Sequence, residues 1–357
     1  LEEEKLQREF TNAVLVPQHK KPMLLYAAEH LSVPISGETA GEIFRLMEQA
    51  GGYGPFAYGP KGFQFHSRAY IKIQDGCNNR CAYCRVPLAR GDSVSIDPQQ
   101  AFQQLLRLEE EGYAEAVITG VNVTSYSFGD FDLAELIRFL LTRTERIRLR
   151  VSSLEPDMIG HELCNVLAAS RIRPHFHIPV QSGSDKVLRL MKRKYNTDIV
   201  KKAFGSLREV KEDPFIAADI IVGFPGEEEI DYQQTRSLIH ELAPAQLHVF
   251  QFSPRPGTAA YTIRPKVPER KAKERSAELR RISDQLHRDY AGRWSGSSIE
   301  GVVIRAGRSE EGNSRVTVLT ENYLEITAEN PSKAKLSPGD SCFVSIAQTG
   351  EMITGRL

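Results

Sequence analysis

The chain has 357 residues, of which 41% are hydrophobic and 26% are charged, and its 46 basic side chains balance 46 acidic ones. This is the composition of a globular protein long enough for two or three domains, and no apolar run approaches the roughly 18 residues of a membrane-spanning helix. Because the formal net charge is zero, any nucleic-acid contact must come from a local basic surface and not from the global field.

Residues 1–67 mix short helical patterns with a stretch rich in Gly, Tyr and Pro, GGYGPFAYGPKGF, which is typical of a loop or linker. We expect no independent core in this region. The chain opens at Leu1 without an initiator Met, which favours a fragment.

Residues 68–262 alternate short β-branched runs with amphipathic helical segments. Six strands are expected: AYIKIQ, EAVIT, RIRLRVS, HFHIPV, FIAADIIV and QLHVFQF. Helical periodicity marks intervening segments such as AFQQLLRLEEE, LAELIRFLL, HELCNVLAA, DKVLRLMKR and DYQQTRSLIHEL. This alternation predicts a parallel sheet with helices outside. Six units are too few for an eight-stranded barrel, so we expect an α/β fold with a partial (β/α)6 barrel.

Cys77, Cys81 and Cys84 lie in the run KIQDGCNNRCAYCRVPLARG, after the first expected strand. Three thiolates on one short loop can hold three corners of a cubane iron-sulfur cluster and leave its fourth iron open. A helix that buries all three cysteines on one face is a competing interpretation, which the turn-forming neighbours Gly76 and Pro87 oppose. A structural zinc site is another, but no second CxxC exists, and the spacing of His66 does not mark it as a fourth ligand.

Polar or glycine residues follow every expected strand. In parallel α/β folds, loops and helix N-termini converge at the carboxyl ends of the strands, and ligands bind there. The residues after the second to sixth strands are Gly120, Val121 and Asn122; Ser152, Ser153 and Glu155; Gln181, Ser182 and Gly183; Gly223, Phe224, Pro225 and Gly226; and Ser253, Pro254, Arg255 and Gly257.

The segment GFPGE, from Gly223 to Glu227, is a glycine-rich turn after a strand, and such turns can hold phosphate on backbone N–H groups. Here four carboxylates follow at once, and they would complement the helix dipole themselves and repel a phosphate. We interpret it as a turn that lets a neutral group, such as an adenine edge, approach the backbone. A simple connection between strand and helix is the alternative.

Residues 263–294 form a basic helical stretch that favours an RNA partner. Its cations include Lys266, Arg270, Lys271, Lys273, Arg275, Arg280 and Arg281. Because glutamates are interleaved with them, a solvated helix with internal ion pairs is an equally good interpretation. Residues 295–357 contain short alternating runs separated by Gly, Asn and Pro, which predict a small antiparallel barrel of the oligonucleotide-binding kind. Tyr323 is a candidate exposed aromatic for RNA.

Six motifs in this order and spacing resemble those of the radical S-adenosylmethionine (SAM) methylthiotransferases. The motifs are GCNNRCAYC, ITGVN, SSLEP, HFHIPVQSGSDKVLRLMKRKY, DIIVGFPGE and HVFQFSPRPGTAAY, and the resemblance extends from about Ala69 to the C-terminus. It implies a transferase in which Cys77, Cys81 and Cys84 hold a 4Fe-4S cluster that binds SAM and cleaves it to a 5′-deoxyadenosyl radical. It also implies that residues 295–357 are a TRAM RNA-binding module.

The same resemblance implies cofactor-binding roles for residues at the strand ends. Tyr83 would lie near the adenine, Gly120 and Asn122 near the methionine amino group, and Arg193 near the SAM carboxylate. Ser153, Glu155, Gln181 and Ser182 would reach the ribose or methionine portion, and Asp219, Gly223 and Gly226 would flank the adenine. A turn cap at Asp219 and a solvated helix charge at Arg193 are the alternatives.

The family has three branches: two modify adenosines beside the tRNA anticodon that carry isopentenyl or threonylcarbamoyl groups, and one modifies a ribosomal-protein aspartate. HVFQFSPRPGT, with His248 and Arg255, is similar to the threonylcarbamoyladenosine branch, and Arg90 with Gly91 favours it too. We therefore expect tRNA, a reducing electron donor protein and a sulfur donor as partners, in the cytoplasm, where five unpaired cysteines suit the reducing conditions. A noncatalytic zinc-loop RNA-binding protein is the alternative from another class.

One departure from the family is large. Family members have an N-terminal domain with three further cysteines that hold a second cluster, yet no cysteine precedes Cys77 here. Cys164 and Cys342 are expected in a helix and in a barrel strand, so they cannot replace those ligands. Either residues 1–67 are the remnant of that domain, or the chain is a variant unable to insert sulfur. We expect it to bind SAM and one cluster without completing methylthiolation.

Overall fold

The structure is a computed structural model, and it describes residues 56, 68–308, 314–331, 335–349 and 352–357. The expected remnant at 1–67, apart from Phe56, and with it His66, therefore lies outside the described residues. Within the described ranges, no helix is both long enough and apolar enough to cross a bilayer.

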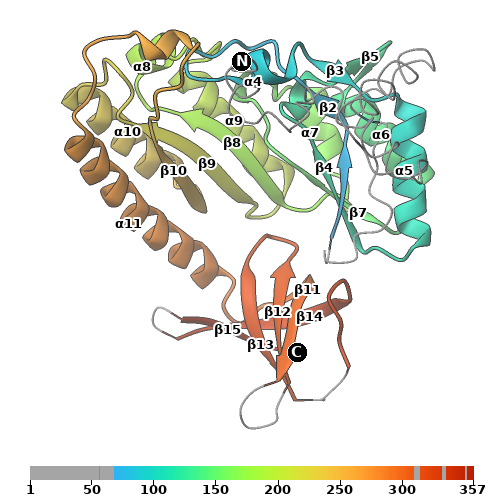
Figure 1. The fold of residues 1–357 in the computed structure, drawn as a ribbon. Coiled ribbons are helices and arrows are strands. Elements are labelled where there is room, and N and C mark those ends of the chain that lie inside the picture. The colour runs from blue at the N-terminus through green and yellow to red at the C-terminus, as the bar shows by residue number, and fades with distance from the viewer. Residues whose placement is uncertain (1–55, 57–67, 309–313, 332–334, 350–351) are drawn as a thin grey trace, which may run out of the picture.

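Six parallel strands in sequential order form an open barrel (Figure 1). They are β1 (Ala69–Lys72), β4 (Glu115–Thr119), β7 (Arg148–Val151), β8 (His175–Gln181), β9 (Phe215–Val222) and β10 (Gln246–Gln251). Hydrogen bonds join β1, β4 and β7 in one sheet and β8, β9 and β10 in another, and a parallel bridge between Leu149 and Ile172 links the two. The predicted partial (β/α)6 barrel is thus confirmed.

The helices pack on the outer face of this barrel (Figure 1). They are α5 (Pro98–Glu110), α6 (Leu133–Arg143), α7 (His161–Leu167), α8 (Asp185–Leu190), α9 (Thr197–Val210) and α10 (Glu229–Leu242). Four begin at a side chain that accepts a backbone N–H: Asp97, Asp132, Ser184 and Asn196. Their apolar stripes meet the strands in one continuous core, and burial of that apolar surface drives the assembly.

Short elements decorate the carboxyl ends of the strands. These are β2 (Gln74–Asp75), α4 (Val86–Arg90), β3 (Val94–Ser95), β5 (Ser127–Phe128), β6 (Phe131–Asp132) and three single 3₁₀ turns at Val123–Ser125, Pro156–Met158 and Ala259–Tyr261. β2 pairs with β3, so both arms of the cysteine-containing loop are tied together.

The long helix α11 (Glu269–Arg293) runs past β10 and β9 and leads to a second, closed barrel (Figure 1). Its strands are β11 (Ser298–Arg308), β12 (Ser314–Thr320), β13 (Glu325–Asn330), β14 (Ser341–Thr349) and β15 (Met352–Arg356), in the order β11-β12-β13-β15-β14. All neighbours are antiparallel except β13 and β15, which run parallel. The small barrel expected at the C-terminus is therefore present.

An ionic network joins the small barrel to β4, to β7 and to the segment before β8. The Glu115 carboxylate binds Arg150 at 2.8 Å and Arg173 at 3.1 Å, and all three side chains are 2% exposed. Arg173 also binds Glu300 of the small barrel at 3.1 Å and Glu321, between β12 and β13, at 3.2 Å. One buried carboxylate thus organises charges from both barrels.

The Tyr323 side chain packs against the end of the large barrel where this network lies. Its prediction as an exposed RNA-binding aromatic is therefore wrong. Its ring stacks on His175 with centroids 3.8 Å apart, and the Arg150 guanidinium lies 5.0 Å from its centroid. Its φ of 69° places this non-glycine residue in the left-handed region, where a tight turn presents the ring to the barrel. Sequence patterning could not show that this loop faces another domain.

Replacement of Glu115 by Ala should destabilise the protein by about 3–5 kcal/mol, because Arg150 and Arg173 would remain buried without a counter-charge. Urea unfolding followed by circular dichroism measures this loss. Glu135→Ala on the exposed face of α6 is the matched control, with an expected change within about 0.5 kcal/mol. A loss below about 1 kcal/mol for Glu115→Ala would contradict the role assigned to the network.

The contribution of Glu115 to the free energy of unfolding should also depend on pH. Burial alone would raise the pKa of this carboxyl, but Arg150, Arg173 and Arg68 hold it well below its ordinary value of 4.5. A depressed folded-state pKa stabilises the fold above the unfolded-state pKa and loses that effect as the pH falls through the folded-state value. The stability difference between wild type and Glu115→Gln should therefore be constant at neutral pH and shrink below about pH 4.5. Urea titrations at pH 7, 5, 4 and 3 test this trend.

Candidate active site

The loop between β2 and α4 carries Cys77, Cys81 and Cys84, and its backbone excludes the helix-face interpretation. Gly76 has a φ of 68°, and a Cβ atom there would lie 1.9 Å from the Asp92 carbonyl oxygen, so only glycine fits. Arg80 has a φ of 49°, which turns the chain between the first two cysteines. The loop therefore spreads its thiols instead of aligning them on a helix.

N–H donors point at all three sulfur atoms. The backbone N–H groups of Asn79 and Val86 donate to Cys77 Sγ at 3.5 Å and to Cys84 Sγ at 3.4 Å. Arg193 Nη1 donates to Cys81 Sγ at 3.0 Å. Burial raises the pKa of the Cys81 and Cys84 thiols, and these donors oppose that shift. Hydrogen bonds to sulfur of this kind stabilise and tune cluster-ligating thiolates.

The spacing of the sulfur atoms favours a cluster over a single metal ion. In a tetrahedral zinc site with bonds of about 2.3 Å, the sulfurs lie about 3.8 Å apart. Within the described ranges, the one group of three or more potential ligands whose ligand atoms all lie within 4.8 Å contains no cysteine. The three free thiols therefore do not form a preassembled site for a single ion, and separate corners of a four-iron cube require thiols that lie further apart. The residues present fit a 4Fe-4S cluster.

Arg193 is buried beside this loop, so it is not a solvated helix charge. Its side chain is 5% exposed, forms an ion pair with Glu155, and lies over the Tyr195 ring at 4.7 Å. Glu155 also accepts a hydrogen bond from Asn79 Nδ2 at 3.3 Å. Burial raises the pKa of Glu155, and the Arg193 guanidinium partly offsets that rise. The pair places one cation and one carboxylate directly behind Cys81.

Gln74 connects the cysteine loop to the loop after β4, a role that the sequence analysis missed. Its side-chain oxygen accepts the Asn122 N–H at 2.8 Å, and its amide donates to the Gly76 carbonyl at 2.8 Å. A Cβ atom at Gly120 would lie 2.9 Å from the Gln74 carbonyl oxygen, so glycine permits the close approach of the two loops. The structure therefore brings the predicted residues Gly120 and Asn122 next to the cysteine loop.

Tyr83 lies on the opposite side of that loop, against the end of β9. Its ring meets Phe224 edge-on, with centroids 6.4 Å apart. The backbone of the adjacent Ala82 donates to Met191 at 2.9 Å and accepts from Ala260 at 2.7 Å. Segments after β8, β9 and β10 thus all contact the cysteine loop.

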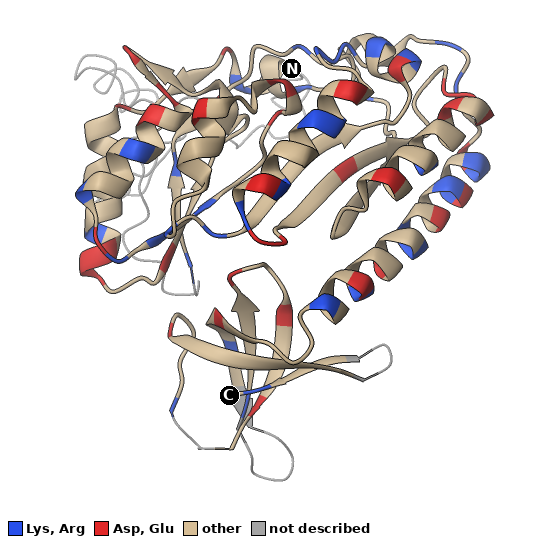
Figure 2. Ribbon diagram, turned by 180° about the vertical axis from the view of Figure 1, so that it is seen from behind, with Lys and Arg blue, Asp and Glu red and all other residues tan. Residues whose placement is uncertain are grey.

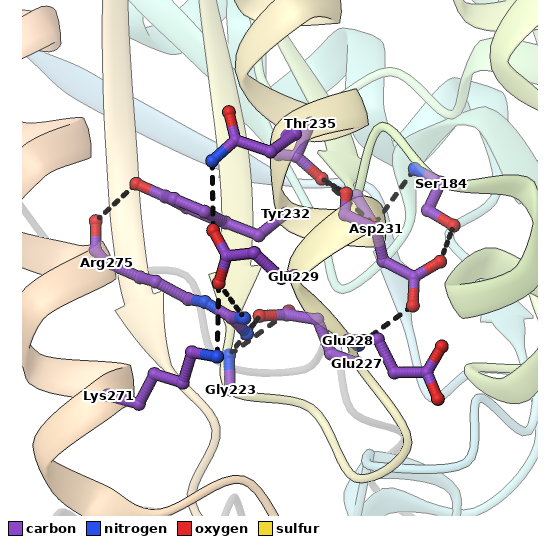
Figure 3. A network of polar contacts seen from close by, with 12 residues as sticks. Ser184, Gly223, Glu227, Glu228, Glu229, Asp231, Tyr232, Thr235, Lys271 and Arg275 are labelled. Carbon is purple, nitrogen blue, oxygen red and sulfur yellow. Dashed lines mark hydrogen bonds and ion pairs between the residues drawn. The ribbon is translucent and has the colours of Figure 1, made fainter.

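In the GFPGE turn, the Gly223 N–H is already hydrogen-bonded to a side chain of the same chain (Figure 3). The Gly223 N–H donates to the Glu227 carboxylate at 3.1 and 3.2 Å, and Glu227 forms an ion pair with Arg275 of α11. A Cβ atom at Gly223 would lie 2.7 Å from Cβ of Ala272, so glycine here permits α11 to pack closely. Gly226 donates its N–H to the Pro265 carbonyl at 2.9 Å.

Most cations of α11 form ion pairs with carboxylates of the same chain. Basic and acidic residues alternate along the helix (Figure 2), and Lys271 and Lys273 pair with Glu229 and Glu269. Arg275 is 3% exposed, so its prediction as an RNA-contacting residue is wrong. The interleaved ion pairs that the sequence suggested are present on this helix.

Gln181 and Ser182, at the end of β8, are both buried, and Gln181 has a φ of 67°. The Ser182 hydroxyl faces α10: it lies 3.4 Å from Thr235 Oγ1 and accepts the Ser184 N–H at 3.2 Å. Cys164 and Cys342 lie half-buried in α7 and β14, in the kinds of element that were expected.

A chain of polar side chains crosses the inside of the barrel, and sequence analysis missed its arrangement. Ser153 Oγ lies 2.8 Å from His177 Nδ1, and His177 Nε2 lies 2.7 Å from Asp219 Oδ1. His248 Nδ1 lies 3.2 Å from the same Asp219 oxygen. The available signal was a polar residue within each of three successive apolar strands.

Comparisons with known proteins agree with this geometry. A family model described as the radical SAM superfamily matches residues 71–239. The threonylcarbamoyladenosine tRNA methylthiotransferase MtaB of Treponema pallidum is 40% identical over 83% of this chain and 60% of its own length. MtaB of Aquifex aeolicus is 32% identical over 87% of this chain and 73% of its own length. The tRNA-2-methylthio-N(6)-dimethylallyladenosine synthase of Hahella chejuensis is 30% identical over 85% of this chain and 68% of its own length. The chain thus spans about three fifths of the length of the T. pallidum relative.

Replacement of Cys81 by Ala should abolish iron incorporation without loss of the fold, because the loop contributes little to the apolar core. Anaerobic reconstitution with iron and sulfide, followed by iron analysis and a visible absorption spectrum, should find about four irons in wild type and almost none in the variant. Cys164→Ala is the control and should keep its iron. Stoichiometric zinc in a colourless wild-type chain would refute the cluster.

Proposed function

Because the chain belongs to the radical SAM methylthiotransferase family, we propose that it acts in the addition of a methylthio group to threonylcarbamoyl-modified adenosine beside the tRNA anticodon. The observation that carries the proposal is the cysteine loop, whose three separated thiols lie at the carboxyl ends of the strands. A 4Fe-4S cluster and SAM are the cofactors of this superfamily. When bound, the cluster would supply the electron for reductive cleavage of SAM.

The residues of this chain would hold and orient the two cofactors. Cys77, Cys81 and Cys84 would ligate the cluster, and Arg193 would offset the thiolate charge that it contacts at Cys81. Glu155 keeps Arg193 in place and holds Asn79 of the cysteine loop. Gln74 keeps the loop after β4 against the cysteine loop, which supports a SAM contact for Gly120 and Asn122.

The other residues predicted to bind cofactor differ in whether their polar groups are already bonded within the chain. Ser153 and Asp219 have side chains inside the barrel, and Tyr83 lies beside the cysteine loop. The Gly223 N–H and the Ser182 hydroxyl are already bonded within the chain. Any role of these two in SAM binding would therefore come from backbone shape and not from a free hydrogen-bonding group.

The threonylcarbamoyl branch is favoured because the chain is more similar to the MtaB relatives than to the dimethylallyladenosine synthase compared with them. MtaB proteins of T. pallidum and A. aeolicus are 40% and 32% identical to the chain, and the dimethylallyladenosine synthase of H. chejuensis is 30% identical. The isopentenyladenosine and ribosomal-protein branches are the alternatives within the family. A noncatalytic zinc-loop protein is disfavoured by the spread of the three thiols.

The proposed partners are tRNA, a protein that donates electrons and a sulfur donor, and the proposed location is the cytoplasm. The small barrel offers Arg305 and Arg315 on its exposed surface as candidate phosphate contacts, although each also pairs with a glutamate.

Hydrogen abstraction from the substrate base tests the proposed function. The reconstituted chain is incubated with SAM, a reductant and anticodon stem-loop RNA whose modified adenine carries deuterium at C2, where the methylthio group of these products is attached. One electron cleaves SAM, and the resulting radical takes the C2 deuterium, so mass spectrometry should find deuterium in 5′-deoxyadenosine. The base radical left at C2 is quenched by a second electron from the reductant and a proton from water. We expect transfer from threonylcarbamoyl-bearing RNA, at least about tenfold above transfer from dimethylallyl-bearing RNA. Absence of 5′-deoxyadenosine, or equal transfer from both RNAs, would contradict the proposal.

A further inference from the structure

Three polar side chains on adjacent strands converge inside the large barrel: His177 on β8, Asp219 on β9 and His248 on β10. Their neighbours along each strand, such as Ile178, Ile220 and Val249, are buried in the core beneath the helices. Because successive side chains of a strand point to opposite faces, the three polar groups face the barrel interior. They are partly accessible, with 21%, 19% and 40% of their side chains exposed.

The hydrogen bonds determine which nitrogen of each imidazole remains available. A carboxylate can only accept, so His177 Nε2 and His248 Nδ1 both donate to Asp219 Oδ1, at 2.7 and 3.2 Å. The second nitrogen of His177 faces Ser153 Oγ at 2.8 Å. Within the described part of the chain, Nε2 of His248 has no such partner. His248 therefore presents one hydrogen-bonding atom, in a set orientation, to whatever enters the barrel.

Phe250 lies two residues further along β10, so it faces the same side of the strand as His248. Its side chain is 53% exposed, which is unusual for a phenylalanine on a barrel strand. It is also nearer the carboxyl end of β10, and hence nearer the cysteine loop. An aromatic face near the reacting end and a polar group deeper inside match a nucleobase that carries a polar substituent.

We propose that His248, oriented by Asp219 and supported through it by His177 and Ser153, is the binding subsite for a polar substituent on the substrate adenosine. This deepens the proposed function and rests on it. A threonylcarbamoyl group carries a hydroxyl and amide N–H groups that can donate to His248 Nε2, the nitrogen left as an acceptor when Nδ1 donates to Asp219. A dimethylallyl group has none and would leave His248 Nε2 desolvated and without a hydrogen-bond partner. His248 is a specificity-determining residue, and Asp219 is a positioning residue.

The same three side chains could instead hold a metal ion, because one ligand atom from each lies within 4.8 Å of the others. A divalent ion coordinated by two imidazoles and a carboxylate would occupy the atoms that otherwise hydrogen-bond to one another. The two occupants make different predictions for metal content, so one set of variants distinguishes them.

The test compares RNA binding by the full chain reconstituted with its cluster, in the presence of SAM and without reductant. Fluorescence anisotropy measures the affinity for anticodon stem-loop RNAs that carry either threonylcarbamoyladenosine or dimethylallyladenosine. We expect wild type to prefer the threonylcarbamoyl RNA, and His248→Leu to lose at least about tenfold of that preference. His248→Gln, whose amide can reach the position of Nε2, should recover part of it.

His161→Leu is the matched control, because His161 is exposed on α7 outside the barrel, and it should keep the wild-type preference. Circular dichroism and iron content verify that each variant folds. Asp219→Asn should reduce the preference less than His248→Leu does, since the imidazole remains and loses only the carboxylate that orients it.

An unchanged preference in His248→Leu would overturn the inference while leaving the proposed function intact. One equivalent of zinc, iron or another divalent metal bound to wild type outside the cluster, and lost in His248→Leu, would overturn it as well. A wild-type chain that binds both RNAs equally would overturn the inference and the threonylcarbamoyl assignment together.

Discussion

The buried carboxylate of Glu115 is the interaction on which the arrangement of the two barrels depends. It lies at the amino end of β4 and binds Arg150 and Arg173, whose guanidinium groups also bind Glu321 and Glu300. Removing charges from water is costly, so such a network persists only when each charge has partners. Here the partners come from both barrels. The small barrel is therefore held at one end of the large one, where its Tyr323 ring closes the opening.

The cysteine loop lies at the other end of the large barrel, at the carboxyl ends of the strands. The loop is held by contacts from several elements: Gln74 and Asn122 on one side, Arg193 and Glu155 behind, and the segments after β8, β9 and β10 on the other. Phe250 and the cluster of His177, Asp219 and His248 lie on strands β8, β9 and β10 of the same barrel. Under the proposed function, a modified nucleobase would lie between the thiols and this cluster.

Several functional and structural residues could be predicted from sequence, and others could not. The cysteine loop was recognisable because three cysteines, Gly76 and Pro87 lie within a few residues of one another. Each strand was recognisable from its β-branched run. Arg275 and Tyr323 were misjudged, since a basic helix and a loop aromatic resemble RNA contacts until their packing partners are known. No sequence pattern marked Gln74 as a site residue, because its role is to hydrogen-bond Asn122 and Gly76, which meet it only in the folded chain.

The sequence by itself determined the order of six strands and their helices, the small C-terminal barrel and the presence of a three-thiol loop. These features follow from local periodicity, turn chemistry and short-range spacing, which act between residues close in the chain. Only the tertiary structure decided that Arg193 lies behind Cys81, that Arg275 secures the turn after β9, and that His177, Asp219 and His248 meet in the barrel. The reason is physical: these contacts join residues 29 to 112 positions apart, so they depend on how the strands align and not on any local pattern.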